Sequence, residues 1–305
     1  MSGDGSVRPR NGRFIAAAVV GFAAAGAARY AYPLLKRTPP GVRKQDWDKR
    51  WGRTNHRGEP VTLLEGPAVA AGAMLAALGT HPAIAVAGAG GAAFGTYDDL
   101  AGSGDRRGFR GHIGALMQGE VTTGMVKLGG IGATGLVSSV MAGGPAADVV
   151  INAGLIAGSA NLLNLFDLRP GRAIKVAVGS SALIVAGGAM SGNAAGAAES
   201  VAPAAGAALA LLPEDLGERA MLGDGGANAV GAMLGAAAAV SLPRPARLVI
   251  LAGIAGLTAA SEKVSFTKVI ERTPALHWLD MLGRRPAAPA RPPIVKIPVP
   301  AEPEE

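Results

Sequence analysis

Two adjacent aspartates, Asp98 and Asp99, follow directly on an apolar run in the stretch GAAFGTYDDLAGSGDRR. A helix end needs at most one acidic side chain, so a pair indicates a further role. Paired carboxylates can bind a divalent cation, or orient and deprotonate an attacking oxygen. From this stretch alone, a doubled helix-end charge remains the alternative.

Other polar residues also stand between apolar runs. NLLNLFD places Asn161, Asn164 and Asp167 three residues apart, which puts them on one face of a helix. Asp224 lies between two glycines in AMLGDGGAN, where a ligand can approach the backbone closely. A helix beginning there would direct its N-terminal amides at this point, and such amides favour phosphate.

Two basic side chains complete the candidate set. Lys127 begins another apolar run and could reach a phosphate. The simpler interpretation is a lysine at the membrane interface whose aliphatic part lies along apolar surface. His277, in ERTPALHWLD, is by itself more often a surface histidine, and the asparagines alone could serve as interhelical hydrogen-bond partners. Carboxylates among basic groups suit Mg²⁺, or Mn²⁺, which neutralises a diphosphate and stabilises a leaving phosphate.

Several other chemistries are excluded. The chain has no cysteine, so it has neither disulfides nor thiolate ligands or nucleophiles. It contains no P-loop, no dinucleotide-binding fingerprint and no nucleophile elbow. The formal net charge of +7 is typical of cytoplasmic loops that face anionic lipid, and we predict no nucleic-acid partner.

Composition indicates the elements that must position these residues. Only 17% of the 305 residues are charged, against about 25% in soluble domains. Aromatic residues make up 4% and there are 46 glycines, which suits close helix packing in lipid better than a soluble core. An Ala/Gly-rich soluble chain is the alternative. Glycine pairs four residues apart recur in the apolar runs, at Gly91/Gly95, Gly188/Gly192, Gly192/Gly196 and Gly231/Gly235.

The apolar runs predict an all-α polytopic membrane protein with about nine to ten transmembrane helices, since a bilayer needs about 20 apolar residues per helix. The predicted spans are 14–35, 62–79, 81–97, 124–142, 145–165, 173–191, 194–212, 226–243 and 246–262. We expect a short N-terminal segment (1–13), a transmembrane domain (14–284) and a disordered Pro-rich tail (285–305).

Loop charges predict which side each loop faces. The long loops are basic, so we expect them in the cytoplasm of a bacterial plasma membrane, together with all the polar residues singled out above. The N-terminus, with Arg8, Arg10 and Arg13, then falls outside, against the rule. The cytoplasmic basic residues include eight between Lys36 and Arg57, then Arg106, Arg107, Arg110, Arg169, Arg172, Lys175 and Arg219.

In this order, the motifs resemble those of the bacterial polyprenyl-phosphate N-acetylhexosamine-1-phosphate transferase family (glycosyltransferase family 4). That family includes phospho-N-acetylmuramoyl-pentapeptide transferase and the N-acetylglucosamine-1-phosphate transferases. The likeness runs from about Arg53 to Gly283. FGTYDDLAG is similar to the paired-aspartate motif, and KLGG matches a lysine that opens the next span. NLLNLFD, AMLGDGGAN and ERTPALHWLD resemble the Asn-x-x-Asn-x-x-Asp, Met-Gly-Asp-x-Gly and histidine motifs.

The resemblance implies that a polyprenyl phosphate attacks the β-phosphate of a UDP-N-acetylhexosamine, with Mg²⁺ required and UMP released. It implies that Asp98 and Asp99 orient or deprotonate the lipid phosphate, and that Asp224 is the chief metal ligand. Asp167 would support the metal or nucleotide site as a further catalytic residue. Substrate binding would fall to Asn161, Asn164, Lys127, His277 and Asn228. A homodimer or other envelope-synthesis proteins are further possible partners.

Three departures bear on this expectation. Where the family continues Gly-x-Asp-Gly-Leu after Asp167, this chain has Leu-Arg-Pro-Gly-Arg, with Arg169 and Arg172. Gly-Gly-Ala follows Asp224 in place of Thr-Gly-Ser, and the histidine cluster is reduced to His277. A second hypothesis is therefore a catalytically inactive relative that binds the lipid carrier or acts as a scaffold. A transporter is less favoured, because it would place charges near the bilayer midplane and show repeats.

Overall fold

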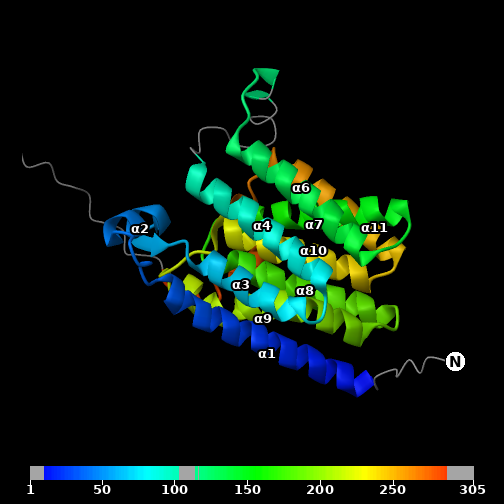
Figure 1. Ribbon diagram of the computed structural model, residues 1–305. Coiled ribbons are helices and arrows are strands. Elements are labelled where there is room, and N and C mark those ends of the chain that lie inside the picture. Colours follow the sequence, from blue (N-terminus) through cyan, green and yellow to red (C-terminus); the bar gives the residue numbers. More distant parts are fainter. Residues whose placement is uncertain (1–9, 103–113, 116, 287–305) are drawn as a thin grey trace, which may run out of the picture.

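The computed structural model describes residues 10–102, 114–115 and 117–286 (Figure 1). Within these residues the chain forms twelve α-helices and one two-stranded antiparallel sheet, which confirms the all-α class. Residues 287–305 of the expected tail, and the loop arginines 106, 107 and 110, lie outside the described residues. The long helices are α1 (Arg10–Leu35), α3 (Glu65–Leu78), α4 (Pro82–Ala101), α6 (Thr123–Ala142), α7 (Ala146–Phe166), α8 (Arg172–Met190), α9 (Ala194–Leu216), α10 (Gly223–Ser241) and α11 (Arg244–Ser261).

The predicted loop 36–57 contains short elements of its own. It holds α2 (Lys44–Trp51) and β1 (Gly52–Thr54), and β1 pairs with β2 (Pro60–Thr62). The hairpin is tied to the connection between α9 and α10, because the Met221 N–H donates to the carbonyl of Thr62. Two more short helices, α12 (Phe266–Arg272) and α13 (Pro274–Met281), follow α11.

Helix α10 is the centre of the bundle, and nearly all of its residues are buried. Helices α3, α4, α7, α8 and α9 pack around it, α1 packs on α3 and α9, and α11 packs on α7 (Figure 1). Glycines allow the closest approaches: a Cβ added to Gly95 of α4 would lie 2.3 Å from the carbonyl oxygen of Asp224 in α10. One added to Gly235 of α10 would lie 2.6 Å from the carbonyl oxygen of Leu155 in α7.

The glycine pairs predicted from sequence therefore divide into two groups. Gly91/Gly95 and Gly231/Gly235 lie where α10 crosses α4 and α7. The two pairs that contain Gly192 do not lie within one helix, because Gly192 has a φ of +78° in the turn between α8 and α9. A positive φ is a turn conformation that glycine adopts without strain, so spacing alone was misleading at this position.

All nine predicted ranges contain helices, but fewer than nine helices have the length and composition of a membrane span. In the described part of the chain five helices do so, namely 12–35 of α1, α6, α7, α8 and α9. A sixth span results if α11 and α12, which meet at a bend of 96°, are taken as one. The prediction of nine to ten spans is thus wrong by this measure. Helix α3 has only 14 residues, and α10 opens with Gly-Asp-Gly-Gly. Because α10 contacts other helices and not lipid, it can be built from glycine and alanine.

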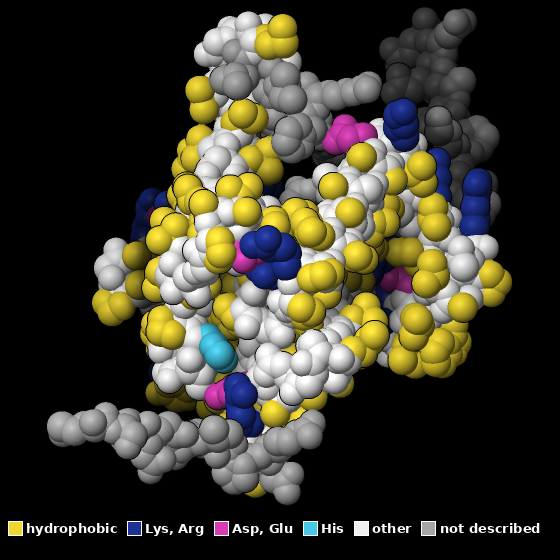
Figure 2. All heavy atoms as spheres, turned by 90° about the vertical axis from the view of Figure 1, so that its right-hand side faces the viewer, with side chains coloured by type: hydrophobic (Ala, Val, Ile, Leu, Met, Phe, Trp, Pro, Cys, Tyr) yellow, Lys and Arg dark blue, Asp and Glu magenta, His cyan; other side chains and the backbone are white. Residues whose placement is uncertain are grey.

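The outer surface of the bundle is apolar, as a membrane protein requires. Large side chains stand exposed on the spans, among them Phe22, Leu183 and Val150. Figure 2 views the end of the bundle where α1 begins, and charged side chains there are few and scattered among hydrophobic ones. Ion pairs at this end join Arg244 to Asp148 and Arg13 to Glu199.

Candidate functional site

A lysine between two aspartates forms the centre of the site, at the end of the bundle opposite that in Figure 2. Lys127, in the second turn of α6, places its Nζ 2.6 Å from Oδ2 of Asp98 in the last turn of α4. The same Nζ binds Oδ2 of Asp224 in the first turn of α10. These side chains are 14%, 17% and 27% exposed, so one ammonium ion and two carboxylates share a largely dry site.

Asp99 has a different role from its neighbour. Its carboxylate accepts hydrogen bonds from the backbone N–H groups of Asp224 (3.1 Å) and Gly225 (2.9 Å). It therefore caps the amino end of α10, where a negative charge also interacts favourably with the helix dipole. On the other side, the guanidinium of Arg53 in β1 donates to the backbone carbonyl of Asp99. Asp99 thus positions α10. Its carboxylate occupies two of the N-terminal amides of α10 for which the sequence predicted a phosphate partner.

Asp167 lies at the carboxyl end of α7, beside this cluster. It accepts a hydrogen bond from the backbone of Gly223. The pKa of Asp167 is raised well above its usual value, first by burial and then by the nearby charges of Asp215, Asp224 and Asp99. A proton on Asp167 is therefore favoured by its surroundings.

The remaining predicted residues are less closely joined to the cluster. Asn161 and Asn164 are half-buried on α7, and within the described residues their side chains form no hydrogen bond. Asn228 is buried and donates to the carbonyl of Asp224 at 2.7 Å, one turn further along α10. His277 of α13 is exposed and has no side-chain hydrogen bond to the described aspartates.

A pocket of about 230 Å³ opens next to Asp167. Its walls are the β1–β2 turn, the α7–α8 connection and the α9–α10 connection, with His56, Asp167, Arg169 and Asp215 among the lining residues. Burial lowers the pKa of His56, and nearby arginines act in the same direction against the charge of Glu218. His56 is therefore predominantly neutral at pH 7.

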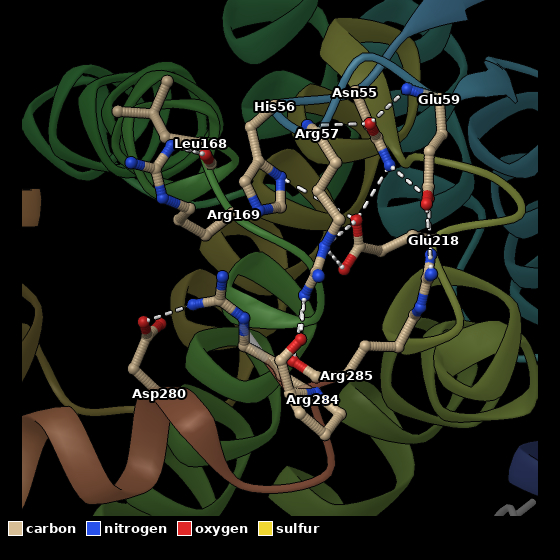
Figure 3. Close-up of polar contacts among 11 residues, drawn as sticks. Asn55, His56, Arg57, Glu59, Leu168, Arg169, Glu218, Asp280, Arg284 and Arg285 are labelled. Atoms are coloured by element: carbon tan, nitrogen blue, oxygen red, sulfur yellow. Dashed lines mark hydrogen bonds and ion pairs between the residues drawn. The ribbon is translucent and has the colours of Figure 1, made fainter. Parts of the chain in front are cut away.

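Glu218 organises one wall of this pocket (Figure 3). Its buried carboxylate accepts from Arg57 at 2.9 and 3.1 Å and from Asn55 at 2.8 Å. Arg57 also donates to the backbone carbonyls of Arg285 and Pro286, so the chain after α13 is fastened to the β-hairpin. Sequence reasoning missed Glu218, and its φ of +55° has no signature in the local sequence.

The two arginines of the Leu-Arg-Pro-Gly-Arg stretch after Asp167, Arg169 and Arg172, have separate positions. Arg172 is buried and forms a two-point ion pair with Asp280, with distances of 2.7 and 3.0 Å, which joins α8 to α13. Burial acts to raise the pKa of Asp280, but its bonds to Arg172 and Arg284 prevail and lower it. Arg169 lines the pocket, and its guanidinium donates to the carbonyl of the adjacent Leu168 (Figure 3). Arg172 is thus a structural residue, whereas Arg169 adds positive charge to the pocket.

The residues of the cluster suit a divalent cation. Mg²⁺ commonly takes one or two carboxylates and completes its shell with water and substrate phosphate. Asp98 and Asp224 direct their Oδ2 atoms at one cationic group, which is now the Lys127 ammonium. In the described part of the chain no three His, Asp or Glu side chains converge to hold a metal by themselves. A metal here would therefore use two aspartates and oxygens from water or substrate.

The fold and the apolar helices define the class of the protein: it is an all-α, multi-pass membrane protein. A comparison of the chain with models of known protein families and with curated proteins found no match.

Proposed function

We propose that this chain is a membrane phosphoglycosyl transferase. It would move a hexosamine-1-phosphate from a UDP-N-acetylhexosamine to a polyprenyl phosphate at the cytoplasmic face of a bacterial plasma membrane, releasing UMP. One observation carries the proposal: Lys127 joins Asp98 to Asp224, and Asp99 and Asp167 lie beside them. These five residues come from motifs spread over more than 120 positions, and they meet at one end of the bundle.

The reaction assigns a task to each member of the cluster. An oxygen of the lipid phosphate forms a bond to the β-phosphorus of the donor, and the bond from that phosphorus to the bridging oxygen breaks. UMP leaves with the electron pair of that bond. Asp98 would accept the proton of a protonated lipid phosphate, and Lys127 would stabilise the negative charge that accumulates on the phosphates. Asp99 would hold the amino end of α10 in place.

A bound Mg²⁺ would supply further neutralisation of the diphosphate. Asp224 and Asp98 are the residues that would hold it, with Mn²⁺ as a possible substitute. The pocket beside Asp167 would receive the nucleotide part of the donor, between the α7–α8 connection and the β-hairpin. Asn161 and Asn164 remain candidates for that side of the site, and His277 for the sugar or diphosphate.

A non-catalytic relative that binds the lipid carrier is the second candidate. The observation that favours it is the mutual saturation of the charged groups. Lys127 binds both Asp98 and Asp224, and the Asp99 carboxylate is used by backbone amides. Such an arrangement is stable without substrate, which a scaffold requires.

Turnover distinguishes the two candidates. The purified protein is incubated with polyprenyl phosphate, Mg²⁺ and a panel of UDP-sugars, and UMP release is measured. The transferase predicts release that falls by at least about 100-fold in Asp98→Asn and Asp224→Asn. Glu271→Gln, an exposed acid on α12, is the matched control and should leave release unchanged. No release with any donor, together with carrier binding, would overturn the transferase and favour the scaffold.

The side of the membrane that each loop faces is tested separately by cysteine labelling. The chain has no cysteine of its own, so only an introduced cysteine can react. A cysteine at Gln45, exposed on α2, should react with an impermeant maleimide only from the cytoplasmic side. A cysteine at Ser191, exposed after α8, should react only from the outside. The reverse pattern would contradict the proposed cytoplasmic location of the site.

A further inference from the structure

A basic segment follows the first span directly. The apolar stretch 12–35 of α1 is long enough to cross a bilayer, and Lys36 and Arg37 come next, both exposed. Residues at the end of a span lie at the level of the lipid headgroups. The ammonium group of Lys36 lies 5.3 Å from the ring centre of Tyr32, which places this charge beside the last turns of α1.

Helix α2 lies at the same end of the protein as the last turn of α1 (Figure 1), and it carries further basic residues. Trp47 and Trp51 lie one turn apart with their rings 5.7 Å from each other, and both pack against the hydrophobic core. This aromatic side fixes α2 to the body of the protein. Lys49 and Arg50, which fall between the two tryptophans, are exposed.

The ion pairs of this segment separate its basic residues into two groups. Arg43 is paired with Asp46 at 2.8 Å, and Lys44 with Asp48 at 2.7 Å. Within residues 36–51, the basic side chains that have no carboxylate partner are Lys36, Arg37, Lys49 and Arg50. We call these four the basic elbow. Their charge is uncompensated, because both acids of α2 are already paired.

We propose that the basic elbow is a docking surface for the headgroups of anionic phospholipids in the leaflet that borders it. Four uncompensated cations beside the end of a membrane span match the pattern that recognises anionic lipid, and each contributes through Coulomb attraction to the negatively charged surface. A lipid surface is the complementary partner because Lys36 and Arg37 directly follow the membrane span. Their charges therefore lie at the level of the headgroups. This surface does not depend on the proposed transferase activity.

The test uses the full-length protein in a neutral detergent, titrated with dioleoylphosphatidylglycerol or with dioleoylphosphatidylcholine, with bound lipid counted by native mass spectrometry. The wild type should bind the anionic lipid more tightly, and added salt should reduce the difference. The variant Lys36→Gln/Arg37→Gln/Lys49→Gln/Arg50→Gln should lose at least about tenfold in apparent affinity for the anionic lipid. The two half-variants, at 36 and 37 or at 49 and 50, should be intermediate.

The chain offers a matched control with four substitutions in the same segment. Arg43→Gln/Lys44→Gln/Asp46→Asn/Asp48→Asn removes two positive and two negative charges, so the net charge is unchanged, and lipid preference should be retained. Circular dichroism and thermal unfolding check that each variant is folded. A folded basic-elbow variant with wild-type lipid preference would overturn the proposal. So would an equal loss in the control, or binding of a soluble polyanion without any preference for the anionic lipid.

Discussion

Replacing Lys127 by methionine is the sharpest probe of the central cluster. Methionine keeps most of the unbranched apolar side chain and removes the charged end group, which leaves Asp98 and Asp224 facing each other without a cation. The two carboxylates now share a single Nζ, so they are close neighbours. The protein should therefore lose stability even in the absence of any substrate.

The size of the loss follows from the burial of the three side chains. Removing one partner of a buried ion pair costs about 3–5 kcal/mol, because an uncompensated charge remains. These side chains keep between 14% and 27% of their exposure, so water relieves part of the cost. We expect a loss near the lower end, about 3 kcal/mol, which corresponds to a fall in Tm of about 6 °C or more.

The assay is thermal unfolding of the full chain in detergent, with and without Mg²⁺. In Lys127→Met the two aspartates no longer have a competing ammonium ion, so Mg²⁺ should restore much of the lost Tm. The wild type should gain less from the same concentration of Mg²⁺. Because this readout needs no donor or acceptor, it tests the cation site independently of turnover.

Lys268→Met, an exposed lysine on α12, is the matched control and should unfold within about 1 °C of the wild type. The double variant Lys127→Met/Asp224→Asn, which removes one of the two facing charges, should recover part of the stability. A Tm of Lys127→Met equal to that of the wild type would refute the reasoning, because it would mean that the lysine does not stabilise the two aspartates in the folded protein.

Four further outcomes can be measured by the same unfolding assay. Gly95→Ala should lower the free energy of unfolding by about 3 kcal/mol, since its Cβ would lie 2.3 Å from a backbone carbonyl of α10, whereas Gly129→Ala, with no atom within 4 Å, should change it by less than about 1 kcal/mol. Arg172→Met should cost about 3 kcal/mol, near the lower end for a buried pair, since Asp280 loses its two-point partner and keeps only the bond from Arg284; a neutral result would contradict the buried pair. Because the pKa of Asp280 is lowered on folding, its contribution is present above the unfolded pKa of about 4, and the gap between wild type and Asp280→Asn should narrow as pH falls below that value. The opposite sign holds for Asp167, whose pKa is raised: Asp167→Asn should raise the Tm at pH 8, and the gain should vanish as pH falls towards 4. A gain that persists at pH 4 would show that the charge of Asp167 is not its cause.

The apolar runs of the sequence located nine helices, because each run is long and its ends are marked by polar, glycine or proline residues. It overestimated the number of spans for a physical reason. Hydropathy measures how well a helix suits lipid, but α3, α4 and α10 are surrounded in large part by other helices. A helix in that position needs small side chains more than strongly apolar ones, so it can be shorter or less apolar than a membrane span.

The sequence by itself determined which chemical groups are present and that they stand between apolar runs. These groups are the four aspartates of the candidate site and the lysine that begins a span, and the chain has no cysteine. Only the tertiary structure decided how they pair. Asp98 and Asp99 are adjacent in the chain, but one binds Lys127 and the other caps α10, because successive residues of a helix point about 100° apart. Glu218 and Arg172 acquired their partners, Arg57 and Asp280, across more than 100 residues. Such pairings depend on which helix ends meet in the bundle, and no local pattern encodes them.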